Sequence, residues 1–305
     1  MKQVTVTVPA TTANLGPGFD CLGLALNLHN TVTFRPVEQG LKISVAGEGA
    51  EAIPTDESNL VYRAAQQLFQ VVGRKPAGLI IEQNNCVPAS SGLGSSASAV
   101  VAGLAGANAL INAGFSQSAL LDMAAEMEGH ADNVAPAFLG GLVLCNSLNQ
   151  PGEPGQFHTE QIPTPVYHVV LVLPDVALLT RDARALLPNQ VSRADAIFNI
   201  SRMGLLIRAL MAGDFAKLAL AMQDRLHQPY RMPLIPGFQA AVRAAQSHGA
   251  VATALSGAGP SLIAFSQDNH RPIADDVQAA FAAAGISSRS WILTSDNNGC
   301  RVQIQ

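Results

Sequence analysis

One stretch of the chain combines small, flexible and hydroxyl-bearing residues in a way that suits an anion. Residues 86–110 read CVPASSGLGSSASAVVAGLAGANAL, with Gly92 and Gly94 between an apolar run and an alanine-rich run. Glycine lets the backbone turn sharply and lets a ligand approach closely. A helix that starts near Ser95 or Ser96 has N–H groups without intrahelical partners, and such an end binds phosphate. The stretch therefore predicts a phosphate-binding loop, with a serine-capped helix that binds nothing as the alternative.

Three known phosphate loops can be compared with this stretch. A Walker A loop requires a lysine, which is missing here. GLGSSA fits the loose dinucleotide pattern G-x-G-x-x-A, but that pattern needs an acidic residue about 20 positions further on, after a second strand. Asp122 falls near this distance and lies in a helical pattern instead. The third is the loop P-x-x-x-G-L-G-S-S-A of the GHMP kinases, and PASSGLGSSA (88–97) resembles it at every fixed position.

The resemblance to the GHMP kinases extends over nearly the whole chain. PATTANLGPGFDCLGLAL (9–26) is similar to their N-terminal substrate motif, and ALSGAGPSLIAF (254–265) to their C-terminal glycine-rich motif. Within the family, EGHADNVAPAFLGG (128–141), TRDARALLP (180–188) and DRLHQPYRMPLIPGF (224–238) are similar to the homoserine kinases. That group often has a serine before the threonine of TRDAR, where this chain has Leu179, so we expect a local change in packing there.

The resemblance implies a fold and an activity. The expected fold is α+β, the two-domain GHMP kinase fold, with an N-terminal domain like domain 2 of ribosomal protein S5 and a ferredoxin-like C-terminal domain. We expect the division at 1–155 and 156–305, because LNQPGEPGQFHT contains two turn-forming Pro-Gly pairs and is the best linker candidate. The implied activity is ATP-dependent phosphorylation of the side-chain hydroxyl of L-homoserine to O-phospho-L-homoserine, on the path to threonine.

The residues that the resemblance assigns to ATP and Mg²⁺ lie in the first half of the chain. Glu128 matches the family's magnesium glutamate and Ser96 its hydroxyl ligand, although most glutamates are surface residues and Glu126 lies close by. Asn59 matches the residue on the adenine side, with a role in the first turn of a helix as the alternative. The implied nucleotide-binding residues are Asn59 and the loop residues Pro88, Ala89, Ser90, Ser91, Gly92, Leu93, Gly94, Ser95, Ser96, Ala97 and Ser98.

L-homoserine is a small zwitterion, and the residues that could bind its charged groups are spread over both halves of the chain. Arginine binds carboxylates in a planar, bidentate way, and Arg184 and Arg231 match the two family positions for this role. Asp20 suits an amino group. Arg181 and Arg225 are interpreted as solvated charges. The implied catalytic residues are Glu128, Asn133, Asn14 and Thr180, and the implied substrate-binding residues are Asn14, Asp20, His130, Asp132, Arg184, Arg231 and Gly257.

No lysine falls in any of these motifs, since the chain has only Lys2, Lys42, Lys75 and Lys217. A lysine-assisted general base is therefore not expected. The proton of the acceptor hydroxyl could pass to the γ-phosphate itself, while the site stabilises charge. Asp132 is the other candidate for accepting this proton.

The periodicity of the sequence predicts the elements that carry these residues. Strands are expected at 3–10, at 31–37 and 41–49 as a hairpin around EQG, and at 136–147 after a turn. Three helices are expected. The first follows Ser58 and ends at Gly73, the second runs from Ser95 to Gly114, and the third runs from residue 116 to Gly129. Mixed strands and helices in both halves, without a repeat, predict two α+β domains.

The amino-acid composition excludes several classes of protein. With 48% hydrophobic and 13% charged residues the chain is typical of a compact globular enzyme, and a net charge of −4 without basic blocks argues against nucleic acid. Neither a signal peptide nor a membrane span is expected, and the scattered Cys21, Cys86, Cys145 and Cys300 favour reduced thiols in the cytoplasm. A homodimer is an expectation at the level of the family. The alternatives are a kinase for mevalonate-like or sugar alcohols and a non-enzymatic regulator, but a regulator would be expected to lose Glu128 or the loop.

Overall fold

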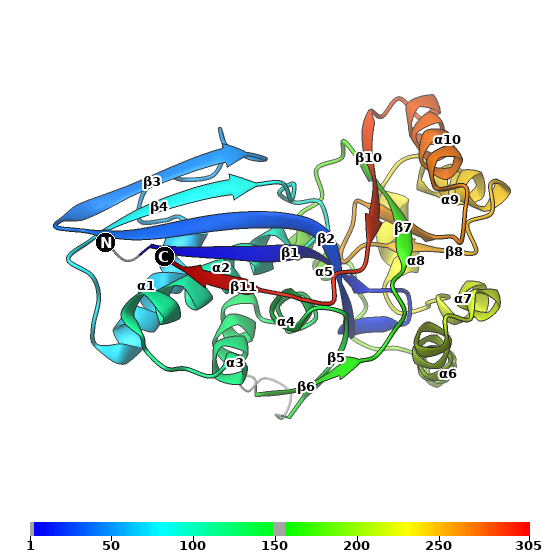
Figure 1. The fold of residues 1–305 in the computed structure, drawn as a ribbon. Coiled ribbons are helices and arrows are strands. Elements are labelled where there is room, and N and C mark those ends of the chain that lie inside the picture. The colour runs from blue at the N-terminus through cyan, green and yellow to red at the C-terminus, as the bar shows by residue number, and fades with distance from the viewer. Residues whose placement is uncertain (1–2, 149–155) are drawn as a thin grey trace.

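Two β-sheets form the framework of the molecule (Figure 1). The computed structural model describes residues 3–148 and 156–305. The larger sheet has the order β11-β1-β2-β4-β3, with β5 paired to β2 and β6 paired to β5. Its strands are β1 (Val4–Asn14), β2 (Gly18–Val37), β3 (Gly40–Gly47), β4 (Gly78–Asn85), β5 (Leu142–Ser147), β6 (Phe157–Ile162) and β11 (Arg301–Ile304).

Four helices cover one face of the larger sheet and enclose the first core (Figure 1). They are α1 (Leu60–Val72), α2 (Ser95–Ile111), α3 (Gln117–Glu128) and α4 (Val134–Leu139). The alternation of β1 explains this arrangement, because Val4, Val6 and Val8 point to the covered face and are fully buried. The polar side chains between them point to the other face, where the hydroxyls of Thr5 and Thr33 lie 3.2 Å apart. At this end of β1, the second face of the sheet is thus polar.

The smaller sheet is antiparallel, with the order β10-β7-β9-β8. Its strands are β7 (His168–Pro174), β8 (Ala252–Leu255), β9 (Leu262–Phe265) and β10 (Ser288–Thr294). Its helices are α5 (Thr180–Ala185), α6 (Arg193–Ala212), α7 (Phe215–Ala221), α8 (Gln228–Arg231), α9 (Phe238–Ser247) and α10 (His270–Ala283), with the 3₁₀ turn η1 at Met232–Leu234. Helices α9 and α10 pack on one face, while the other face joins α6, α7 and the ends of β1 and β2 in a shared core.

The second half of the chain contributes to both sheets. Strands β6 and β11 follow residue 155 in the sequence but pair with β5 and β1 of the larger sheet. The expected domain boundary and most of the linker lie outside the described residues. The division at residue 155 stays a prediction, and β11 returns the C-terminus to the first layer (Figure 1).

Two local expectations are wrong. Strands β2 and β3 do not form a hairpin, because β4 inserts between them, antiparallel to β2 and parallel to β3. The turn between β2 and β3 packs closely against the start of β4, since a Cβ on Gly78 would lie 2.3 Å from the backbone of Gln39. Residues 134–139, expected as a turn and the start of a strand, form α4 instead. Gly140 and Gly141, both with positive φ, end this helix before β5 begins.

The helix boundaries show what the sequence pattern resolves. Helix α3 ends at Gly129 in the left-handed conformation, as predicted. Helix α2 ends two residues earlier than expected, because Asn112 adopts the left-handed conformation that Gly114 was expected to supply. Helix α1 is capped by Asn59 rather than by Ser58, and Gly73 ends it as predicted.

Helix α2 is buried nearly all round, which explains its small residues. A Cβ on Gly103 would lie 2.4 Å from the carbonyl oxygen of Val61 in α1. A Cβ on Gly106 would lie 2.2 Å from the ring of Phe34 in β2. Two glycines therefore let α2 approach α1 and the sheet closely.

In the part of the chain that the structure describes, no helix has the length and apolar character to span a membrane.

We expect Gly106→Ala to destabilise the protein although alanine is the better helix former. The added methyl group meets the Phe34 ring, and overpacking a core costs about 1–3 kcal/mol. The matched control is Gly204→Ala in the middle of α6, where nothing lies within 4 Å of the new Cβ. There the same change should add about 0.4–1 kcal/mol to the free energy of unfolding. Urea denaturation of both variants checks this, and equal shifts in one direction would contradict the packing argument.

Candidate active site

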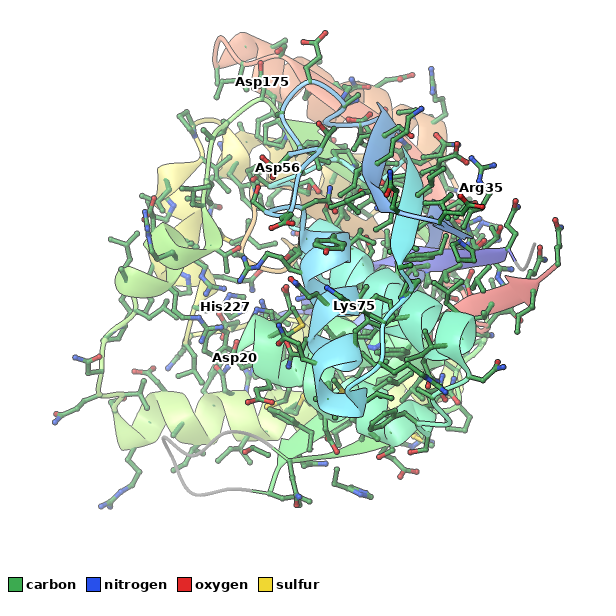
Figure 2. The ribbon with its side chains drawn as sticks, turned by 90° about the vertical axis from the view of Figure 1, so that its left-hand side faces the viewer. Asp20, Arg35, Asp56, Lys75, Asp175 and His227 are labelled. Carbon is green, nitrogen blue, oxygen red and sulfur yellow. The ribbon has the colours of Figure 1, made fainter. Side chains whose placement is uncertain are left out.

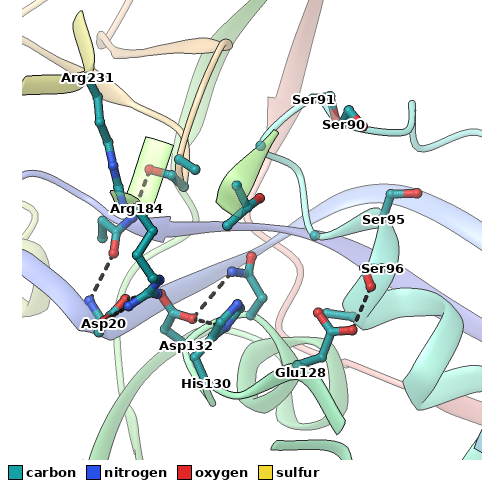
Figure 3. Close-up of a pocket in the computed structure, with 18 residues that line it drawn as sticks. Asp20, Ser90, Ser91, Ser95, Ser96, Glu128, His130, Asp132, Arg184 and Arg231 are labelled. Atoms are coloured by element: carbon teal, nitrogen blue, oxygen red, sulfur yellow. Dashed lines mark hydrogen bonds and ion pairs between the residues drawn. The ribbon is translucent and has the colours of Figure 1, made fainter. Parts of the chain in front are cut away.

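A polar pocket of about 180 Å³ opens where the two sheets meet. It is lined by residues from all the motifs singled out in the sequence, from Asn14 near the N-terminus to Gly257 in the C-terminal glycine-rich loop. Every other lining residue except Ala258 was also predicted from the sequence. Figure 3 shows two ends: Ser96 and Glu128 lie at one, and Asp20, Arg184 and Arg231 at the other.

The phosphate-loop prediction places its glycines at a strand-to-helix turn, where β4 leads into α2. Gly94 is the N-cap of α2 with a φ of 67°, and no side chain caps the helix. The first N–H groups of α2 therefore have no partner within the helix, as an anion site requires. The alternative of a serine-capped helix is wrong, because the capping position holds glycine.

The two loop glycines are required for a reason other than ligand approach. A Cβ on Gly94 would lie 2.0 Å from the hydroxyl oxygen of Thr11, and one on Gly92 would lie 2.2 Å from the carbonyl oxygen of Ser256. Both φ angles are also positive, a conformation that L side chains rarely adopt. The glycines thus allow the loop to press against the other two motifs. Leu93 between them is fully buried, so only its backbone can face a ligand.

A second pocket, of about 290 Å³, lies on the other side of the loop. Apolar residues such as Ile53 and Pro54 line it, together with Asn59 and Ser98. The Asn59 side chain is already engaged: its oxygen accepts bonds from Val61 N, Tyr62 N and Gln83 Nε2, and its amide donates to Pro54 O. The helix-capping role proposed as the alternative for Asn59 is therefore real. Its adenine role stays a prediction.

The two residues predicted for Mg²⁺ lie in direct contact. Ser96 at the start of α2 donates a hydrogen bond of 2.6 Å to Glu128 Oε1 at the end of α3 (Figure 3). Glu126, the alternative, is exposed and does not line the pocket. Hydroxyl and carboxylate oxygens suit Mg²⁺, which commonly takes one or two protein ligands and completes its shell with water and phosphate. The residues present therefore fit the ion. In the described ranges no larger group of His, Cys, Asp and Glu side chains could hold a metal.

At the other end of the pocket, Asp20 and Arg184 form a bidentate ion pair. Arg184 Nη1 and Nη2 lie 2.7 and 2.8 Å from the two Asp20 oxygens. The hydrogen bonds that Arg184 donates to Asp20 raise the pKa of Arg184 above its usual value, and the pair is partly exposed to solvent. Asp20 reaches this place from a backbone with a φ of 57°, held by its N–H bond to Asn14 Oδ1.

Arg231 differs from Arg184 because it is buried. Its exposed fraction is 1%, and within residues 3–148 and 156–305 it forms no ion pair. Burial lowers the pKa of this guanidinium, an effect that the charge of Asp20 partly offsets. A buried charge without a partner is costly, so its placement beside a pocket indicates an anionic ligand. Arg181 and Arg225, interpreted as solvated charges, are 84% and 50% exposed and do not line the pocket.

His130 and Asp132 form a second charged pair in the pocket, with His130 Nδ1 2.8 Å from Asp132 Oδ1. Burial alone lowers the pKa of His130. The hydrogen bond and charge of Asp132, together with the charges of Glu128 and Asp20, outweigh burial and raise it. The nearby carboxylates therefore favour the protonated form of His130 more than water does for a free imidazole.

The two predicted asparagines hold the pocket wall together. Asn14 donates to Gly257 O at 2.8 Å, and its oxygen accepts the Asp20 N–H, so both ends of its amide are used. Asn133 accepts a bond of 2.8 Å from the Thr11 hydroxyl and directs its amide toward Asp132. Thr11 did not stand out in the sequence, although it lies in the first motif. Only its contact with Asn133 and Gly94 distinguishes it.

Thr180 begins α5 and reaches the pocket from a helix that lacks a cap. Leu179 occupies the N-cap position, makes no side-chain hydrogen bond and is 51% exposed. The expected change in packing at this position is thus the loss of a capping hydroxyl and the exposure of an apolar side chain.

Comparisons with known proteins agree with this geometry. The family model for the N-terminal domain of GHMP kinases matches residues 59–141, and the model for their C-terminal region matches residues 206–286. A homoserine kinase of Microchaete diplosiphon is 46% identical over 98% of this chain and 97% of its own length. The chain belongs to the GHMP kinase family. A homoserine kinase of Moorella thermoacetica is 42% identical to this GHMP kinase, over 97% of the chain and 99% of the relative.

Solved structures confirm the predicted fold of this GHMP kinase. The crystal structure of homoserine kinase from Cytophaga hutchinsonii superposes with a TM-score of 0.87 at 33% identity, over 99% of this chain and 97% of the other. An L. major mevalonate kinase in complex with R-mevalonate superposes with a TM-score of 0.71, but at 18% identity it shows only that the fold is shared. The resemblance drawn from the sequence motifs is therefore confirmed at the level of the family.

We expect Glu128→Gln to lower kcat at least about a hundredfold, in line with the loss of one strong electrostatic contribution. The amide keeps the size of the side chain but removes the charge that would hold a cation beside Ser96. Glu126→Gln, two residues earlier on the same helix and exposed, should be nearly silent. Steady-state rates at varied Mg²⁺ test both. A silent Glu128→Gln would show that the metal is held elsewhere.

Leu179→Ser should restore a cap to α5 and make the helix more stable by about 0.5–2 kcal/mol. The gain should appear as slower amide hydrogen exchange at Arg181 and Asp182, the second and third residues of α5, whose N–H groups a hydroxyl at the N-cap can reach. Leu186→Ser at the opposite end of α5 is the control, since Leu186 is similarly exposed but follows the helix. Equal protection in both variants would rule out capping as the cause.

Proposed function

We propose that this GHMP kinase transfers the γ-phosphoryl group of ATP to the side-chain hydroxyl of L-homoserine. The product would be O-phospho-L-homoserine, in the biosynthesis of threonine. The observation that carries the proposal is the convergence of Asp20, Arg184 and Arg231 at one end of the pocket, opposite Ser96 and Glu128. Relatives that are 40–46% identical and named homoserine kinase support it.

The proposed ATP site uses both sides of the loop 88–98. The phosphates would bind at the free N–H groups of Ser95, Ser96 and Ala97, where the helix dipole also favours negative charge. The purine would enter the more apolar pocket beside Asn59. Mg²⁺ bound by Glu128 and Ser96 would neutralise phosphate charge as it develops. The contact between the Ser96 and Glu128 side chains at one end of the polar pocket supports this assignment.

The proposed acceptor site suits a zwitterion. A carboxylate placed between Arg184 and Arg231 would meet two guanidiniums, and an ammonium group would meet Asp20. The ion pair between Asp20 and Arg184 orients both side chains before the substrate binds. Mevalonate is a second candidate acceptor, but it carries no cation for Asp20. Asp20 therefore favours an amino acid.

The proposed chemistry relies on positioning and charge neutralisation, as phosphoryl transfer requires. Lys42, Lys75 and Lys217 lie away from the polar pocket, and Lys2 lies outside the described residues, so a lysine-assisted base has no support. Two groups could take up the proton that the substrate hydroxyl loses: the γ-phosphate and the Asp132 carboxylate. The raised pKa of His130 favours a cation beside Asp132. We place the enzyme in the cytoplasm, consistent with four free cysteines.

Arg231→Leu should raise KM for L-homoserine about ten- to a hundredfold and leave KM for ATP little changed. A hydrogen bond to a charged group contributes about 1.5–3 kcal/mol, and each 1.4 kcal/mol is about tenfold in affinity. The variant should also lose its preference for L-homoserine over 3-aminopropan-1-ol, which has the amine and hydroxyl without the carboxylate. Steady-state kinetics with both alcohols and with R-mevalonate provide the measurement.

The matched control is Arg225→Leu. Arg225 lies on the same segment, but it stacks on Phe198 and pairs with Asp195 outside the pocket. It should change neither KM. If Arg231→Leu weakens ATP and homoserine equally, or both alcohols equally, Arg231 does not bind the carboxylate.

A further inference from the structure

Arg231 is held by a neutral partner rather than by a carboxylate. Its Nη1 lies 3.3 Å from His227 Nδ1, and its Nε lies 3.4 Å from the carbonyl oxygen of Ala183. Arginine has donors and no acceptor, so Nδ1 of His227 must accept this hydrogen bond. The nitrogen that faces Arg231 is therefore unprotonated.

The second ring nitrogen of His227 completes the assignment of the tautomer. His227 Nε2 lies 2.8 Å from the carbonyl oxygen of Gly16, which can only accept. The proton of the neutral imidazole is thus on Nε2. Burial lowers the pKa of His227, and the neighbouring charge of Arg231 lowers it further, against an opposing effect of Asp224. His227 is 0% exposed and lies in the interior, whereas Arg35 and Asp175 lie at the periphery (Figure 2).

The nearest buried carboxylate on this segment is occupied elsewhere. Asp224 Oδ2 accepts from His227 N and Gln228 N, and thereby caps the start of α8. Asp224 Oδ1 accepts from Asn199 Nδ2 and Leu226 N. With four donors on its two oxygens, Asp224 keeps its position beside His227 and does not reach Arg231. The charge of Arg231 is not cancelled by direct contact.

One aromatic ring lies close to both arginines. Phe19 stacks on the His227 ring with centroids 5.2 Å apart and an angle of 22°. The guanidinium carbon of Arg231 lies 5.1 Å from the Phe19 ring centroid, and that of Arg184 lies 5.6 Å from it. The negative face of an aromatic ring attracts cations, so Phe19 allows two like charges to share one end of the pocket.

We propose that His227 is a positioning residue for substrate recognition. Its Nε2-protonated tautomer, set by Gly16, presents an acceptor that orients the buried Arg231 and leaves the full charge of Arg231 for the substrate carboxylate. A carboxylate in the place of His227 would orient the guanidinium equally well but would neutralise it. The inference rests on the proposed function, because it deepens the role of Arg231 in binding the carboxylate.

Two amide substitutions separate the two hydrogen bonds of His227. Glutamine can place its amide N–H near the position of Nε2, so His227→Gln keeps the bond to Gly16 and loses the acceptor for Arg231. Asparagine can place its oxygen near the position of Nδ1, so His227→Asn keeps the acceptor and loses the bond to Gly16. We expect His227→Gln to raise KM for L-homoserine about tenfold or more, with kcat and KM for ATP little changed. His227→Asn should rescue most of that KM while it lowers the melting temperature.

A purely structural His227 would give a different pattern. Both variants would then melt earlier and would affect L-homoserine and 3-aminopropan-1-ol alike, which would overturn the proposal. An unchanged KM for L-homoserine in a folded His227→Gln would overturn it as well. If His227→Asn does not fold, the comparison of His227→Gln with the wild type on the two alcohols still decides.

The tautomer of His227 can be determined by NMR in the absence of substrate. A ¹⁵N–¹H correlation spectrum of the wild-type protein should show His227 neutral, with its proton on Nε2, and a proton on Nδ1 would refute the assignment. This measurement also separates the two hypotheses. A wild-type protein that has this tautomer but does not phosphorylate L-homoserine would overturn the proposed function and leave the hydrogen-bonded arrangement of His227 and Arg231 in place.

Discussion

Direct backbone contact between three distant segments is the constraint on which the site depends. Thr11 N donates to Leu93 O at 3.0 Å, and Gly257 N donates to Ala13 O at 3.1 Å. The Ser256 hydroxyl completes the contact with a bond of 2.7 Å to Gly92 O. Strands of the larger sheet, the phosphate loop and the C-terminal glycine-rich loop therefore share one hydrogen-bonded junction. A Cβ at the centre of this junction would separate the segments, which is why they are rich in glycine.

The junction gives the pocket its separation of charge. The end near α2 and α3 offers a helix N-terminus and one carboxylate, an arrangement for phosphate with a metal ion. The end near α5 and α8 offers Asp20 beside two arginines, an arrangement for a small zwitterion. Since both ends are held by the same backbone contacts, the distance between the proposed nucleotide and acceptor sites is determined by the junction rather than by flexible side chains. Positioning of this kind is the main contribution that a protein makes to phosphoryl transfer.

Much of the fold was predictable because local patterns and tertiary packing agree. The alternation of β1, the stop of α1 at Gly73 and the stop of α3 at Gly129 follow from periodicity and from the left-handed preference of glycine. The errors occur where packing at a distance decides. β4 displaces β3 from β2 because the apolar residues of β4 pair with both neighbours, and no local signal at EQG reveals a strand that arrives later in the chain.

The sequence by itself determined the family, the fold class and nearly all the residues that line the pocket, because these depend on short motifs whose residue types are set by their chemistry. Tertiary structure decided how those residues are used. Gly92 and Gly94 make room for neighbouring segments, and Asn14 joins the first motif to the last. The tautomer of His227 depends on Gly16, more than two hundred residues away along the chain. Such roles arise from contacts between residues far apart in sequence, which neither spacing nor residue type encodes.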